Sequence, residues 1–119
     1  MRNISKLDRL KKILSLHYKA KYSEMNTDDV IEKLKKIKPF LQQEYAVMSL
    51  GLFGSFADGT HTNSSDVDLI VEFEHSIGSQ FFKLEKYLEE TLDRKIDLVT
   101  ESALKKQIKP FILNQIRYI

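Results

Sequence analysis

The stretch 51–73, GLFGSFADGTHTNSSDVDLIVEF, constrains the fold most strongly. It holds three of the four glycines of the chain, and it contains two apolar runs separated by a polar segment. The run before Gly54 and the run after Ser65 both have the apolar content of a β-strand. The segment 58–65 between them is rich in turn-forming residues and should be an exposed loop. The stretch therefore predicts two strands joined by a polar loop.

Two carboxylates stand where the second strand begins. Side chains alternate faces along a strand, so Asp66 and Asp68 should project from the same side. The continuous apolar run 69–71 that follows is typical of a strand covered on both faces. Two carboxylates at the edge of such a strand form a suitable site for a hard divalent cation, which prefers oxygen ligands.

The glycine at the end of the first strand supplies the features of a phosphate site. Gly54 has no side chain, so a triphosphate can approach its backbone closely. The amides that follow and the Ser55 hydroxyl can donate hydrogen bonds to phosphate oxygens. Either feature alone would fit a plain turn or a solvated strand start. Together, the glycine turn and the carboxylate pair predict metal-assisted phosphoryl or nucleotidyl transfer.

A third strand is expected over 95–100, and it contains Asp97. A charge inside an apolar strand is costly unless it is paired or binds a metal. From this segment alone, a surface aspartate on an edge strand is a reasonable alternative. His61, in the loop beside the expected site, is interpreted as a solvated loop residue without a catalytic role.

The periodicity of apolar residues predicts an α/β or α+β fold, in which a small mixed β-sheet is flanked by helices. A helix should begin at Asn26, with that residue as its N-cap, and Pro39 should end or kink it near residues 37–38. The remaining elements are expected as strands 46–53, 66–73 and 95–100, a helix over 79–93, and a final helix after Thr100 that contains Pro110.

The composition excludes several classes of site. With 119 residues, the chain is expected to form one compact catalytic domain with a modest core. There is no cysteine, which excludes disulfides, thiolate zinc sites and cysteine nucleophiles. No apolar run approaches the length of a membrane span, and the N-terminal residues lack the apolar core of a signal peptide. We therefore expect a cytoplasmic protein without a membrane partner.

The charge is distributed unevenly. Residues 1–22 carry seven lysines and arginines against one aspartate, a net charge of +6, whereas the other 97 residues carry a net charge of −4. We expect residues 1–25 to form a basic helical extension and residues 26–119 to form the catalytic domain. An apolar stripe on the extension could dock a partner protein or a second copy of the chain, and the alternative is a solvated helix. Nucleic acid is not an expected partner.

Three blocks in order carry a resemblance to a known family. Gly54-Ser55 is followed after ten residues by Asp66-Val-Asp68, and the block 94–100 reads RKIDLVT. This pattern resembles the signature of the polymerase-beta-type nucleotidyltransferase superfamily. In detail it is similar to the minimal nucleotidyltransferases, small antitoxins that act beside HEPN-domain toxins. The likeness covers residues 26–119.

The resemblance implies a nucleotidyltransferase fold and a set of roles. Asp66 and Asp68 would bind two Mg²⁺ ions, and Asp97 would be the third catalytic and metal-binding carboxylate. Gly54 and Ser55 would bind the outer phosphates of ATP. The acceptor would be a hydroxyl, expected to be that of a tyrosine, on a partner HEPN toxin, which would be silenced by AMPylation.

One position departs from the family pattern. Relatives have arginine where this chain has Asp58, which places a negative charge near a bound polyanion. This residue supports an alternative function, a catalytically weak or inactive antitoxin that neutralises its toxin by stoichiometric binding. Transfer to an antibiotic or to an RNA end is disfavoured, because 119 residues leave no room for a second substrate-binding domain.

Overall fold

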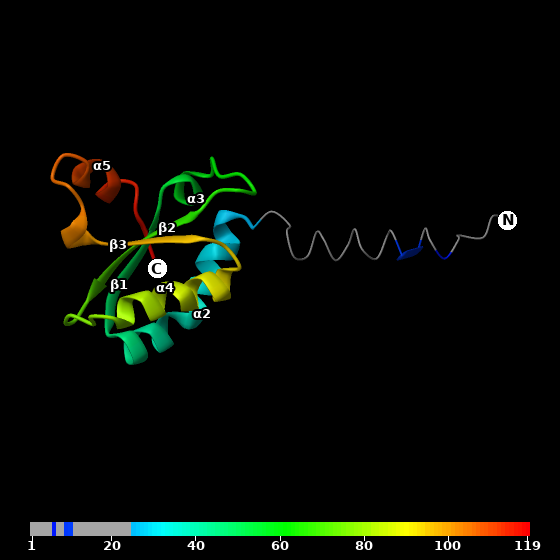
Figure 1. Cartoon of the computed structure of the whole chain (residues 1–119). Helices are drawn as coiled ribbons and strands as arrows, with labels where there is room; N and C mark the ends of the chain where they lie inside the picture. Colours follow the sequence, from blue (N-terminus) through cyan, green and yellow to red (C-terminus); the bar gives the residue numbers. More distant parts are fainter. Residues whose placement is uncertain (1–5, 7–8, 11–24) are drawn as a thin grey trace.

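A computed structural model describes residues 6, 9–10 and 25–119 (Figure 1). The expected basic extension therefore lies almost wholly outside the described residues. In the described part of the chain the elements are α2 (Thr27–Tyr45), β1 (Val47–Phe53), α3 (Ser55–Asp58), β2 (Val67–Phe73), α4 (Gln80–Leu92), β3 (Ile96–Thr100), the 3₁₀ helix η1 (Glu101–Ala103), α5 (Lys109–Leu113) and β4 (Arg117–Tyr118).

The strands form one mixed sheet in the order β3-β2-β1-β4. The pairs β1–β2 and β1–β4 are antiparallel, whereas β2 and β3 are parallel. The three predicted strands and the predicted fold class are confirmed. The fourth strand, β4, was not predicted.

Helices α2 and α4 cover the same face of the sheet (Figure 1). The buried leucines are seven residues apart in α2 and four apart in α4, and they pack in one core with the inward side chains of the strands. The middle of β2 is buried on both faces, as the run 69–71 predicted. The core consists of Val30, Leu34, Leu41, Val47, Leu50, Leu52, Phe56, Val67, Leu69, Val71, Leu84, Leu88, Leu92, Ile96 and Leu98. Among the described residues, no helix combines the length and apolar character that crossing a bilayer requires.

Helix α2 begins as predicted but continues beyond the predicted end. The Asn26 side chain accepts a hydrogen bond from the Asp29 N–H (2.8 Å), and the Asp29 carboxylate accepts one from the Asn26 N–H (3.1 Å), which forms a capping box. The sequence predicted that Pro39 would end or kink the helix near residues 37–38, and the predicted end is wrong, because α2 runs through Pro39 to Tyr45. Continuing the helix buries Leu41 completely, which offsets the hydrogen bond that proline cannot make.

The C-terminal segment is not the single helix that the sequence predicted. After β3, the Thr100 hydroxyl accepts a hydrogen bond from the Ala103 N–H (3.2 Å) and caps η1. Pro110 does not kink a helix but lies in the first turn of α5, where its missing N–H has no cost. The chain then returns as β4 along β1, because Gly51 leaves room for the Ile116 side chain on the sheet.

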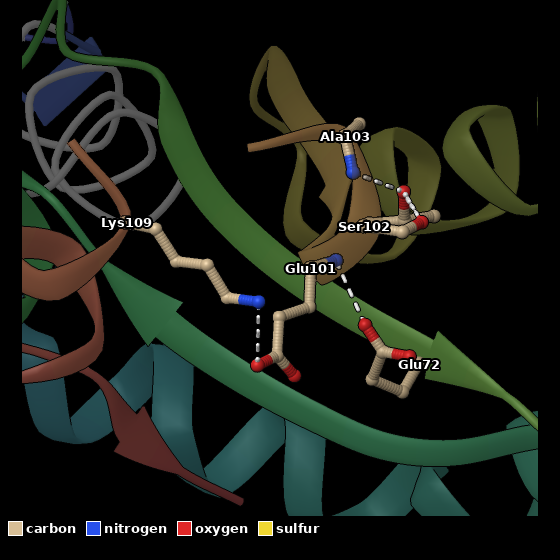
Figure 2. Close-up of polar contacts among 6 residues, drawn as sticks. Glu72, Glu101, Ser102, Ala103 and Lys109 are labelled. Carbon is tan, nitrogen blue, oxygen red and sulfur yellow. Dashed lines mark hydrogen bonds and ion pairs between the residues drawn. The ribbon is translucent and has the colours of Figure 1, made fainter. Parts of the chain in front are cut away.

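Polar contacts hold this segment at the far end of β2 (Figure 2). The Glu72 carboxylate accepts a hydrogen bond from the Glu101 N–H (2.8 Å), and the Glu101 side chain forms an ion pair with Lys109 (3.5 Å). The C-terminal segment is thereby attached to β2 at the opposite end from Asp68.

Candidate active site

The turn after β1 places a bare backbone against a carboxylate. Gly54 has φ 70° and ψ −153°, a conformation that side-chain-bearing residues adopt only with strain. A Cβ atom at this position would overlap the carboxylate of Asp68. Glycine is therefore required twice, by its backbone conformation and by the approach of Asp68. The short helix α3 begins immediately afterwards at Ser55.

The sheet register brings two of the predicted carboxylates together. Asp68 pairs with Asp97 across the parallel strands β2 and β3, and it also lies opposite Phe53 at the end of β1. Paired residues on neighbouring strands project on the same face. Gly54, Asp68 and Asp97 consequently lie together at one edge of the sheet, where β1 ends and β2 and β3 begin.

Asp66 precedes β2 and is exposed, whereas Asp68 is half-buried. Burial raises the pKa of Asp68 to about 6, with further contributions from the negative charges of Asp97 and Asp66. Asp66 and Asp97 therefore both act electrostatically on Asp68. Such mutual repulsion is the condition that a bound cation would relieve.

The carboxylates do not form a closed metal cage. In the described ranges, no three histidine, aspartate or glutamate side chains converge closely enough to hold an ion. Mg²⁺, however, is commonly bound through one or two carboxylates, with water and substrate phosphates completing the octahedron. Asp68 and Asp97, paired on adjacent strands beside the Gly54 turn, fit that chemistry, and the missing ligands would come from the nucleotide.

Asp58, the position that departs from the family pattern, takes part in a loop turn. Its carboxylate accepts hydrogen bonds from the N–H (2.9 Å) and the hydroxyl of Thr60. These bonds, together with the nearby His61, lower the pKa of Asp58. Asp58 is the first residue of an Asp-Gly-Thr sequence, which is typical of a turn stabilised by the aspartate side chain. Asp58 therefore has a structural role in the loop.

His61 is not the solvated loop residue that the sequence suggested. Its ring stacks on Phe56 with centroids 4.0 Å apart and planes 10° from parallel. The Nδ1 atom is buried and has no hydrogen-bond partner among the described residues. The loop therefore packs onto the buried ring that follows the Gly54–Ser55 turn.

Arg94 contacts both the loop and that ring, and sequence reasoning gave it no role. Its Nη1 donates to the carbonyl oxygens of Asn63 (2.8 Å) and Ser65 (3.4 Å). Its guanidinium carbon also lies 5.3 Å from the centroid of the Phe56 ring. The signal that could have identified it was its place at the start of the block 94–100.

Other features lie away from this edge. A cavity of about 430 Å³ is lined by residues at the opposite end of β2, including Glu72 and Phe81, and by no predicted site residue. Tyr87 packs against Phe40 with ring centroids 5.0 Å apart.

Comparison with known proteins gives concordant matches. The family model described as a nucleotidyltransferase domain matches residues 34–119. A candidate protein adenylyltransferase of Methanocaldococcus jannaschii is 42% identical over 77 residues, which cover 64% of this chain and 90% of the relative. The protein adenylyltransferase MntA of Thermococcus cleftensis is 33% identical over 96 residues, covering 80% and 97% of the two chains.

Two solved structures share the fold. A candidate minimal nucleotidyltransferase superposes with a TM-score of 0.70 at 24% identity and covers 80% of this chain and 97% of its own. A complex of a tri-AMPylated HEPN toxin with an MNT antitoxin from Shewanella oneidensis gives a TM-score of 0.53 at 20% identity, covering 74% and 68%. At these identities the likeness establishes the architecture alone.

Proposed function

The chain belongs to the nucleotidyltransferase family, and we propose that it moves AMP from ATP onto a hydroxyl of a partner protein. The observation that carries this proposal is the edge where Gly54 abuts the carboxylate of Asp68, which in turn pairs with Asp97. Relatives named protein adenylyltransferases, aligned over most of their own length, support protein as the acceptor class.

We assign the partner as a HEPN-type toxin and the acceptor as a tyrosine hydroxyl. The fold shared with an MNT antitoxin that was solved with a tri-AMPylated HEPN toxin supports the choice of partner, whereas tyrosine as the acceptor follows from the family resemblance alone. Adding AMP to the toxin would place charge and bulk on it and silence it, so the chain would act as an antitoxin. Because ATP is the donor, the expected compartment is the cytoplasm.

The nucleotide would bind at the turn after β1. Gly54 would bind the outer phosphates through its backbone, which adopts a turn that a residue with a side chain could not adopt without strain. The amide and hydroxyl of Ser55, at the first position of α3, are the proposed donors to the phosphate oxygens. A substitution that adds a side chain at Gly54 would displace Asp68 and alter both halves of the site.

Asp66, Asp68 and Asp97 would hold two Mg²⁺ ions, whose charge would neutralise the triphosphate and stabilise the pyrophosphate leaving group. Asp97, exposed beside Asp68, would accept the proton of the acceptor hydroxyl or orient it. The hydroxyl oxygen forms a bond to the α-phosphorus, and the bond from that phosphorus to the oxygen bridging the α- and β-phosphates breaks.

The alternative, an inactive antitoxin that acts by binding alone, drew its support from Asp58. The hydrogen bonds to Thr60 account for an aspartate at this position through the loop turn. These bonds supply a structural reason for Asp58 but leave its charge in place, so stoichiometric binding stays the alternative that the transfer experiment must distinguish.

Intact-mass analysis of the partner tests the proposal. The full chain is incubated with ATP, Mg²⁺ and the co-encoded partner, and we expect the partner to gain the mass of one or more AMP units. Asp68→Asn should abolish the gain, whereas Asp28→Asn, the same change at an exposed position in the first turn of α2, should leave it intact. A partner of unchanged mass, or normal transfer by Asp68→Asn, would overturn the proposal.

A further inference from the structure

Arg94 connects the two halves of the site, although it lies outside the set of proposed ligands. Helix α4 ends at Leu92, and Asp93, which has φ 51°, caps it in a left-handed conformation. Arg94 follows in the short link to β3, and its side chain reaches back to the loop that precedes β2. Its Nη1 donates to the carbonyls of Asn63 and Ser65. The Ser65 carbonyl belongs to the peptide bond that leads directly to Asp66.

The same guanidinium contacts the phosphate half of the site through Phe56. This ring is fully buried and lies one residue beyond Ser55, in the first turn of α3. The Phe56 carbonyl accepts a hydrogen bond from the Thr27 hydroxyl at the start of α2, which fixes the backbone of the turn to the core. The guanidinium over the Phe56 ring therefore couples α3 to the loop.

The stacking of His61 on Phe56 leaves a polar atom unsatisfied, so other contacts must stabilise the loop. Its ring stacks on Phe56, but the buried Nδ1 lacks a partner among the described residues, which carries a desolvation cost. Because the buried Nδ1 disfavours this loop conformation, other contacts must stabilise it. Arg94 supplies them at Asn63 and Ser65, on the C-terminal side of the stack.

We propose that Arg94 is a positioning residue for nucleotidyl transfer: it holds the Gly54–Ser55 turn and the segment leading to Asp66 in a fixed relation. Its catalytic consequence rests on the proposed function. An arginine suits this task because its planar guanidinium can donate to two carbonyls and also lie over a ring. The ammonium group of a lysine is not planar, so it cannot donate to two carbonyls and also lie flat over a ring.

The test compares Arg94→Gln and Arg94→Lys with Lys95→Gln in the full chain. Lys95 is the neighbouring exposed cation, so its substitution removes the same charge one residue away. Three quantities are measured: amide hydrogen exchange over 59–66, ATP affinity by calorimetry, and the rate of AMP transfer to the partner at saturating ATP. Thermal melts establish that each variant is folded.

Arg94→Gln should accelerate exchange over 59–66 and lower kcat by ~10- to 100-fold, the effect of removing a residue that orients ligands. Most of the loss should fall on kcat, since a small displacement of reacting groups costs far more in rate than in binding. Arg94→Lys should be intermediate in both measurements, and Lys95→Gln should match the wild type.

Two results would overturn the assignment. Unchanged exchange over 59–66 in both Arg94 variants would show that the residue does not hold the loop. Loss of ATP affinity with normal exchange would make Arg94 a direct phosphate ligand instead. If the wild-type chain transfers no AMP, the proposed function fails, and the exchange measurement still decides whether Arg94 positions the loop.

Discussion

Asp68 lies half-buried between the Gly54 turn and Asp97, and burial together with the neighbouring carboxylates raises its pKa to about 6. A raised pKa means that the folded protein holds this proton more tightly than the unfolded chain does. The ionised form that would bind a cation is therefore the form that the fold favours less. A site of this kind gives up stability for function.

Asp68→Asn should stabilise the protein near neutral pH while abolishing transfer. The wild type loses stability as pH rises through the window from the ordinary value of 3.8 to about 6, and asparagine removes that loss. After discounting for partial solvent screening, we expect a gain of ~1 kcal/mol in the free energy of unfolding at pH 7.5. Urea denaturation at pH 7.5 and below pH 4 measures it, and the gain should vanish at the lower pH.

Asp28→Asn serves as the control, because Asp28 is exposed and should give no such gain. If Asp68→Asn is less stable than the wild type at pH 7.5, then Asp68 is not strained by its neighbours in the folded state.

Strand periodicity predicted the positions of Gly54 and Asp68, and the resemblance added Asp97, which the register places opposite Asp68. Their roles as site residues stay a prediction. The roles of His61 and Arg94 could not be predicted in this way. Both depend on how an eight-residue polar loop folds back on Phe56, and the local sequence of a loop does not encode that path.

Among the elements, α2 shows tertiary packing overriding a local signal. Pro39 should break a helix, yet the turn beyond it carries Leu41 into the core. The strands β1, β2 and β3 were predictable from their apolar runs. The two-residue strand β4 was not, since its pairing depends on the room that Gly51 leaves on a strand distant in sequence.

Pro39→Ala should therefore stabilise the protein. Alanine restores a donor within α2 and removes the proline ring from a helix interior, where proline costs ~3 kcal/mol; because the helix has already adapted, we expect a gain of ~1–2 kcal/mol. Urea denaturation compares it with Pro110→Ala, a matched change in the first turn of α5, where proline is favourable and no gain is expected. Equal effects of the two substitutions would contradict this account of α2.

At the scale of the whole molecule, the described fold begins at a helix N-cap. The capping box at Asn26 begins α2, and Met25 packs partly against the core, so residues 25–119 contain the elements of a complete sheet and its two covering helices. The basic segment before them would then serve association. We propose that it docks the partner or a second copy.

Deletion of residues 1–22 should leave the melting temperature and ATP affinity close to wild type but weaken association with the partner or change the oligomeric state. The removed segment carries a net charge of +6, so the weakening should be largest at low ionic strength. Size-exclusion chromatography and calorimetry at two salt concentrations measure it. Equal complex formation by the truncated and full-length chains would exclude this role.

We propose that the edge formed by Gly54, Asp68 and Asp97 transfers a nucleotidyl group. Parallel reactions with the partner, Mg²⁺ and ATP labelled at either the α- or the γ-phosphate test this transfer most directly. We predict that label from the α-phosphate becomes covalently attached to the partner, that label from the γ-phosphate is released as pyrophosphate, and that Asp68→Asn prevents both. Attachment of the γ-label, or of neither label, would contradict the account.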